Sequence, residues 1–115
     1  MSAFTAAETA YLRSGPALGR LATVDPTGQP RIVPIGWSFN EHLGTIEIRG
    51  RDLAATRKYR DVQSNPKVAF IVDEVLPPWQ PRSVIVHGRA EAVAEPDTHI
   101  RIHPTRVISW GLESS

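Results

Sequence analysis

The sequence contains no cysteine, which excludes disulfides, thiolate metal sites, iron–sulfur clusters and cysteine nucleophiles. It also lacks a marked excess of either charge, because 13 basic and 12 acidic residues leave a net charge of +1. A general nucleic-acid-binding protein needs a surplus of cations to pair with phosphates, so we expect none here. No apolar run is long enough to cross a bilayer, and the first residues do not resemble a secretion signal. We therefore expect a cytoplasmic protein with no membrane partner.

Several catalytic motifs are missing as well. There is no Gly-x-Gly-x-x-Gly, Walker or Gly-x-Ser-x-Gly pattern, so Rossmann, P-loop and α/β-hydrolase sites are excluded. What remains is a composition that is 41% hydrophobic and 22% charged, as in ordinary globular proteins. A chain of 115 residues has the size of one domain, and we expect a single domain over residues 1–115.

Short alternating runs and turn residues predict a mainly β protein. The expected elements are a helix that begins with a Thr5–Glu8 capping box and ends at Gly15-Pro16, strands at 18–24, 31–39 and 45–49, a helix at 53–63 capped by Asp52, and strands at 67–73, 83–94, 98–103 and 106–110. Residues 77–81 are proline-rich and are expected to stay outside the sheet. Pro34 requires an edge or bulge position, and Gly88 suggests a bulge. Hairpin-length turns favour a six-stranded antiparallel sheet that curls into a barrel. The alternative is an open α+β sheet.

The densest group of cations lies in and before the second expected helix. It comprises Arg49, Arg51, Arg57, Lys58 and Arg60. Arg57 and Lys58 directly follow Thr56 close to a helix start, where hydroxyl, cations and the helix dipole together suit a phosphate. The alternative is an ordinary solvated helix face.

The order of these segments resembles the pyridoxamine 5′-phosphate oxidase superfamily. Arg31-Ile32-Val33 is similar to its Arg-x-Val strand, and Thr56-Arg57-Lys58, followed by Asn65-Pro66, to its Ser-Arg-Lys helix. The hairpin at 19–30 resembles its first hairpin. The ending at 102–111 is similar to the last strand of its short, deazaflavin-dependent branch. Gly36 replaces the lysine that the oxidases keep in the second strand, and their substrate-binding C-terminal region is missing.

The resemblance implies a split β-barrel that forms a homodimer with two cofactor sites at its interface. Both departures favour the deazaflavin coenzyme F420 as the cofactor, with FMN as the alternative, and a small organic molecule as the redox substrate. The cofactor-binding residues that it implies are Arg31, Pro34, Ile35, Gly36, Trp37, Thr56, Arg57, Lys58, Arg60, Trp79 and Trp110.

Each of these residues has an expected place. The phosphate would contact Arg57 and Lys58, and the ring would lie along residues 34–38, with Trp37 either a core residue or a cofactor wall. Trp79 or Trp110 would come from the partner subunit and stack on the ring. Arg49, Arg51 and Arg60 are available for the polyglutamate tail of F420.

No proton donor is identified from the sequence. Arg20, Ser38 and Tyr59 are candidates, and each is equally compatible with a structural role. A metal site is not expected, because His99 and His103 fall on a strand, where a spacing of four residues separates them by about 13 Å.

Three classes of function fit these residues. The first is an F420- or FMN-dependent oxidoreductase. The second is a non-catalytic carrier or sensor that binds a flavin, a deazaflavin or a tetrapyrrole in the same groove. The third is a structural dimer without a ligand, against which the presence of Thr56, Arg57 and Lys58 speaks.

Overall fold

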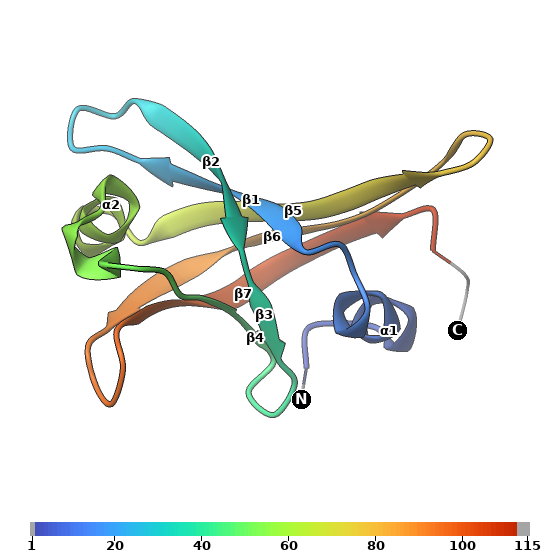
Figure 1. Ribbon diagram of the computed structural model, residues 1–115, viewed down its shortest axis with the longest axis horizontal. Coiled ribbons are helices and arrows are strands. Elements are labelled where there is room, and N and C mark those ends of the chain that lie inside the picture. Colours follow the sequence, from blue (N-terminus) through green and yellow to red (C-terminus); the bar gives the residue numbers. More distant parts are fainter. Residues whose placement is uncertain (1, 113–115) are drawn as a thin grey trace.

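The protein is a curled antiparallel sheet with two short helices, as seen in a computed structural model that describes residues 2–112 (Figure 1). The elements are α1 (Ala6–Arg13), β1 (Leu18–Val24), β2 (Pro30–Gly36), β3 (Ser38–Asn40), β4 (Thr45–Ile48), a 3-10 turn (Leu53–Ala55), α2 (Arg57–Ser64), β5 (Lys67–Leu76), β6 (Gln80–Val93) and β7 (His99–Trp110). The expected mainly β, antiparallel class is confirmed. Within residues 2–112, no helix has both the length and the apolar character needed to cross a bilayer.

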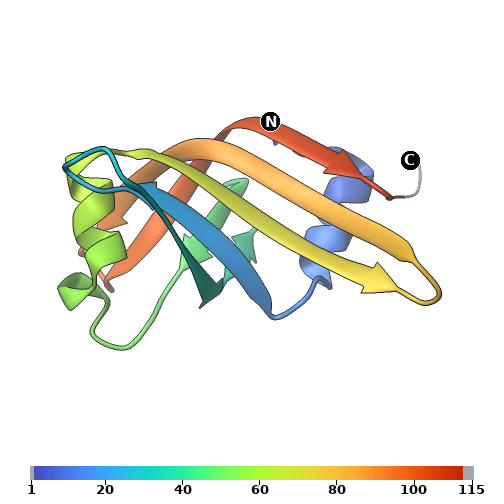
Figure 2. The same cartoon turned by 90° about the horizontal axis from the view of Figure 1, so that it is seen from above.

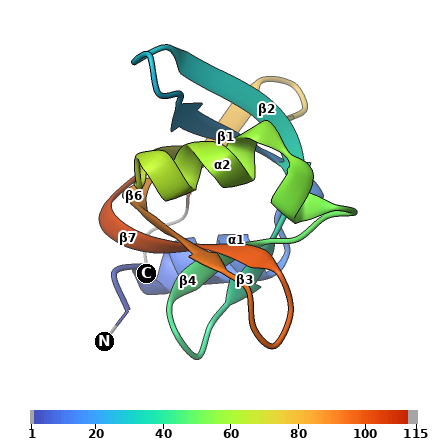
Figure 3. The same cartoon turned by 90° about the vertical axis from the view of Figure 1, so that its left-hand side faces the viewer.

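The strand order explains why the sheet curls. The seven strands pair in the order β2-β1-β5-β6-β7-β4-β3, and every pair is antiparallel. The two edge strands, β2 and β3, are consecutive in the chain and are separated by Trp37 alone. The sheet must therefore bend until its two edges meet on the same side, as the end-on view shows (Figure 3). These edges do not pair with each other, so the barrel is split.

The core occupies the concave side of this sheet. Its most completely buried side chains are Leu21, Ile46, Ile48, Phe70, Val72, Val84, Val86, Ile100 and Ile102. The helices α1 and α2 lie toward opposite ends of the sheet (Figure 2). The capping box of α1 is confirmed, because the Thr5 side chain accepts from the Glu8 amide while the Glu8 carboxylate accepts from the Thr5 amide.

The strand count differs from the expected six. A single strand at 31–39 was predicted, but Trp37 interrupts it and separates β2 from β3. Pro34 lies on β2, which is an edge strand, as expected for a residue without an N–H group.

The last two expected strands are one continuous strand, β7. Pro104 does not end it, because the register between β6 and β7 shifts between His87 and Gly88, opposite this proline. Pro104 stays opposite Gly88 and Thr105 is the residue left out of the register, so the ladder is irregular beside the residue that has no N–H to donate. The Thr105 hydroxyl donates to the His87 carbonyl oxygen across the bulge at 3.1 Å. The register shift lies at Gly88 as predicted, but the extra residue is Thr105 on β7.

Two further predictions were wrong in their boundaries. β5 continues past residue 73 to Leu76, and β6 begins at Gln80, so Pro81 stands opposite Val75 in the sheet instead of in a loop. A proline fits an antiparallel ladder wherever the missing N–H would point away from the partner strand.

The start of the second helix was also wrong. Asp52 adopts a left-handed conformation with φ of 50° and makes no side-chain cap. Thr56 caps the helix instead, because its extended backbone ends the preceding 3-10 turn and its side chain accepts from the Tyr59 amide. As a result Arg57 and Lys58 are the first two residues of α2.

Candidate functional site

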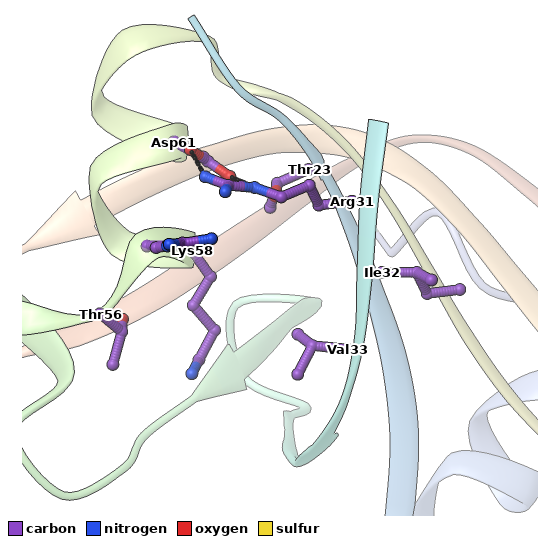
Figure 4. Close-up of a pocket in the computed structure, with 8 residues that line it drawn as sticks. Thr23, Arg31, Ile32, Val33, Thr56, Lys58 and Asp61 are labelled. Carbon is purple, nitrogen blue, oxygen red and sulfur yellow. Dashed lines mark hydrogen bonds and ion pairs between the residues drawn. The ribbon is translucent and has the colours of Figure 1, made fainter. Parts of the chain in front are cut away.

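A cavity of about 260 Å³ lies between the edge strand β2 and the start of α2. Thr23 on β1 completes its wall (Figure 4). We call this hollow the Lys58 cavity; its lining residues are Thr23, Arg31, Ile32, Val33, Thr56, Arg57, Lys58 and Asp61. The structure therefore brings together four of the residues expected from the sequence: Arg31, Thr56, Arg57 and Lys58.

Arg31 and Asp61 form the fixed wall of this cavity. The Arg31 Nη2 and Nε groups donate to Oδ1 and Oδ2 of Asp61 at 2.8 and 3.1 Å. The Thr23 hydroxyl donates to Oδ2 of the same carboxylate at 2.8 Å. The hydrogen bond from Arg31 holds the pKa of Asp61 below its ordinary value. Two of the Arg31 nitrogens are thus committed to Asp61, and Nη1 is the one left for a ligand.

Asp61 and Thr23 were not among the expected site residues. The role of Asp61 depends on a contact across 30 residues with Arg31, and no local pattern indicates such a pair.

The Thr56 hydroxyl, which the resemblance places at the ligand, is engaged within the chain. It donates to the Leu53 carbonyl oxygen at 2.6 Å and accepts from the Tyr59 amide at 3.3 Å. The single hydroxyl proton is therefore used within the chain. Thr56 positions the first turn of α2 and lines the cavity.

Arg57 and Lys58 are the available cations of the site. Within residues 2–112, neither side chain takes part in an ion pair or a hydrogen bond with another side chain. In Figure 4 the Lys58 side chain extends away from Asp61, toward the space between Thr56 and Val33. Their position on the first turn of α2 places both charges beside free backbone N–H groups, an arrangement that suits an anion.

Arg60 lies beside the Lys58 cavity but not in it. It lines an adjoining hollow of about 250 Å³ together with Pro26, Arg31, Arg57 and Asp61. Arg57 borders both hollows. The cationic cluster thus offers two neighbouring places for negative charge.

The expected ring path along β2 leads away from the Lys58 cavity. Pro34 is exposed, Ile35 is buried, and a Cβ atom added to Gly36 would meet no atom within 4 Å. Trp37 is half-buried, and its indole N–H donates to the Pro16 carbonyl oxygen at 3.0 Å. Its ring contacts Phe70 edge-on, with ring centroids 5.5 Å apart. Both roles considered for Trp37 remain compatible with these contacts.

Trp79 and Trp110 are not brought to the Lys58 cavity of their own chain. Trp79 lies in the turn between β5 and β6, and Trp110 ends β7 opposite Ser83, near the same end of the sheet. α2 lies at the other end (Figure 1). The two indoles are 75% and 56% exposed, so they are accessible to a second molecule.

The candidate proton donors have structural partners in two of three cases. The Arg20 guanidinium donates to Asp73 at 3.1 Å, and the buried Tyr59 hydroxyl donates to the Val93 carbonyl oxygen at 3.3 Å. Ser38 is exposed on β3.

The histidines of β7 are engaged with carboxylates. The buried His99 ring lies 3.1 Å from Glu47, and His103 lies 2.9 Å from Glu91. No group of three or more potential ligands that could hold a metal occurs in the part of the chain from residue 2 to residue 112.

Comparison with known proteins agrees with the fold. The chain is 44% identical, over 96% of its length and 84% of the relative's, to a 5a,11a-dehydrotetracycline/5a,11a-dehydrooxytetracycline reductase of Streptomyces rimosus. The solved FAD-binding protein of Mycobacterium smegmatis superposes with a TM-score of 0.73 at 27% identity, covering 93% of this chain and 94% of that one. A solved F420 reductase superposes with a TM-score of 0.68 at 22% identity, covering 91% and 98%. The family model of pyridoxamine 5′-phosphate oxidase matches residues 5–108, and the chain therefore belongs to that family.

Proposed function

We propose that this protein is an oxidoreductase that binds F420, or FMN as the second candidate, with the cofactor phosphate held by Arg57 and Lys58. The observation that carries the proposal is the Lys58 cavity, where two cations that have no side-chain partner among residues 2–112 lie at the start of a helix. The fit to a phosphate is good, because the guanidinium, the ammonium and the helix dipole are all attractive to an anion. A named reductase at 44% identity supports redox chemistry.

F420 is favoured over FMN by the second hollow. FMN carries one phosphate, whereas F420 carries a phosphodiester and a tail of glutamates. Arg60 lines the adjoining hollow, and Arg57 borders both this hollow and the Lys58 cavity. Arg60 is therefore placed to receive a second negative group. The resemblance in fold to an F420 reductase is consistent with this choice.

When bound, such a cofactor supplies the hydride, and the chain supplies position and shielding. Arg57 and Lys58 would hold the phosphate while Arg31, fixed by Asp61, would shape the wall beside it. The ring would extend along Pro34, Ile35 and Gly36, where the space beside Gly36 is open within the chain. A small organic acceptor would receive the hydride there; the relative's name suggests a polycyclic one.

We also propose that the protein is a homodimer. In antiparallel sheets, residues directly opposite each other share a face. The register places Ile71, Ile85 and Ile108 in one row on the convex face. Leu18 lies on the same face and is 55% exposed. We infer that these apolar side chains lie at an interface, because a two-fold dimer would cover them on both copies at once.

Titration with F420 and with FMN, followed by tryptophan fluorescence, tests the proposal. Trp37 lies on the expected ring path, so binding should quench emission in a saturable way. Lys58→Ala should weaken F420 binding by about tenfold or more, since a charge-assisted contact is worth about 1.5–3 kcal/mol. Lys67→Ala is the matched control, because Lys67 is exposed on β5 and does not line either hollow.

Each outcome separates the alternatives. Quenching by F420 that Lys58→Ala weakens and Lys67→Ala does not would support the proposal. The reverse preference would make FMN the cofactor. If neither compound quenches, Arg57 and Lys58 form only a solvated helix face. If the cofactor binds and is never reoxidised by quinones, enones or biliverdin, the protein is a carrier.

A further inference from the structure

A third hollow, of about 390 Å³, lies at the far end of the edge strand β2 and is larger than the Lys58 cavity. It is formed between α1 and the junction of β2 with β3, which lie side by side in Figure 1. We call it the Trp37 cavity; its lining residues are Leu12, Arg13, Gly15, Pro16, Ala17, Trp37, Ser38, Phe39 and Glu41. We propose that it binds the hydride acceptor, and that this acceptor is a planar, polycyclic molecule with an anionic or enolic oxygen.

This inference rests on the proposed cofactor site, because the location of the Trp37 cavity matters through its relation to the Lys58 cavity. The Lys58 cavity includes Val33, and the Trp37 cavity begins at Trp37, four residues further along the edge. A strand rises about 3.3 Å per residue, so Val33 and Trp37 are separated by about 13 Å along the edge. A cofactor with its phosphate at the first would therefore bring its ring to the mouth of the second.

Two of the residues that line the Trp37 cavity, Trp37 and Phe39, are aromatic and held in place. Trp37 is fixed by its hydrogen bond to the Pro16 carbonyl oxygen and by its edge-on contact with Phe70. Phe39 is fixed by an edge-on contact with Phe4, with ring centroids 5.4 Å apart. Aromatic walls that do not need to be ordered on binding favour a flat, ring-containing ligand. A volume of this size falls in the range of small-molecule sites.

The polar groups of the Trp37 cavity indicate an oxygen-bearing ligand. Arg13 on α1 and Glu41 in the turn after β3 form an exposed ion pair, and the hydrogen bond from Arg13 lowers the pKa of Glu41. Glu41 accepts from Nε and Nη2 of Arg13, so Nη1 is the nitrogen left for a ligand oxygen. The Ser38 hydroxyl, on the same wall, is exposed and can donate a further hydrogen bond.

The test uses 1-anilinonaphthalene-8-sulfonate, a flat aromatic anion whose emission rises in apolar surroundings. We expect saturable binding with energy transfer from tryptophan. Ser38→Phe, which fills the Trp37 cavity from its exposed side, should weaken binding by about tenfold or more. Ser64→Phe is the matched control at the exposed end of α2 and should leave binding unchanged. Arg13→Ala is the second variant: it should weaken the sulfonate by about fivefold but leave the uncharged N-phenyl-1-naphthylamine unaffected.

Equal binding to Ser38→Phe and Ser64→Phe would overturn the inference, because the dye would then bind outside the Trp37 cavity. An equal loss of both dyes in Arg13→Ala would also contradict it. This outcome can be told apart from a failure of the cofactor proposal. If both variants still show quenching by F420 or FMN, and dye binding is unchanged in both, only the acceptor site is contradicted. Cavity-dependent dye binding without any cofactor quenching would overturn the proposed function and, with it, the identification of the dye site as an acceptor site.

Discussion

Arg31 on the edge strand β2 and Asp61 on α2 are joined by two hydrogen bonds, of 2.8 and 3.1 Å, across the wall of the Lys58 cavity. The Asp61 side chain is only 3% exposed, whereas that of Arg31 is 31% exposed. This pair fixes the distance between the strand and the helix that border the cavity. The helix that carries Arg57 and Lys58 is therefore held at a fixed distance from the strand.

Asp61→Asn should lower the free energy of unfolding by about 1–3 kcal/mol at neutral pH. The substitution keeps an acceptor for Thr23 but removes the negative charge that Arg31 needs, and one side of this pair is open to water, which reduces the cost. Denaturant unfolding measures the change. Asp52→Asn is the control, because Asp52 is exposed and makes no cap; an equal effect of the two substitutions would contradict the assigned role.

The same pair predicts a pH dependence. The pKa of Asp61 is lower in the folded state than in the unfolded state, so its contribution is fully present above the unfolded value of about 3.9. It is lost as the pH falls through the folded value. The stability difference between the natural protein and Asp61→Asn should therefore shrink below about pH 4. A difference that stayed constant on acidification would show that the folded pKa is not depressed.

Cofactor binding should weaken as salt is added. Arg57, Lys58 and Arg60 line open hollows, so a bound anion and these cations are partly screened by solvent ions. Raising the ionic strength from about 0.05 to about 0.5 M should weaken F420 binding by about fivefold or more, and FMN binding by less. Fluorescence titrations at both salt concentrations measure this. Equal salt dependence for the two cofactors would argue against a second anionic contact at Arg60.

Gly88→Ala should destabilise the protein by about 1–3 kcal/mol, because a small-to-large change here forces the backbone to shift. An added Cβ would lie 2.6 Å from the His103 carbonyl oxygen at the bulge. Gly36→Ala is the matched control, since its Cβ would meet nothing within 4 Å. Thermal unfolding should therefore separate the two variants. Equal midpoints would mean that β7 can move away from Gly88 without cost.

Leu18→Glu should convert the proposed dimer into a monomer. Leu18 is 55% exposed on the convex face, and a carboxylate buried there in a two-fold interface would be costly. Leu43→Glu is the control, because Leu43 is similarly exposed, at 51%, in the turn between β3 and β4. Sedimentation velocity gives the mass of each variant. A monomeric natural protein, or a dimeric Leu18→Glu, would overturn the proposed interface.

Local patterns in the sequence determined the class of the fold and predicted the candidate residues of the site. Alternation and hairpin turns predicted the antiparallel strands, the Thr5–Glu8 pair predicted the start of α1, and Gly88 predicted the bulge. Each depends on neighbours a few residues apart, whose geometry the backbone alone constrains. The identity of Arg57 and Lys58 as phosphate-binding candidates likewise came from adjacent residues.

Only the tertiary structure decided how these parts meet. The break at Trp37, the ion pair of Arg31 with Asp61 and the continuity of β7 through Pro104 all depend on contacts between distant segments. The helix start moved from Asp52 to Thr56 because one hydroxyl could satisfy both the preceding turn and the next helix. Each of these features depends on the packing and hydrogen bonding of the whole fold, so it cannot be predicted from a short stretch of sequence.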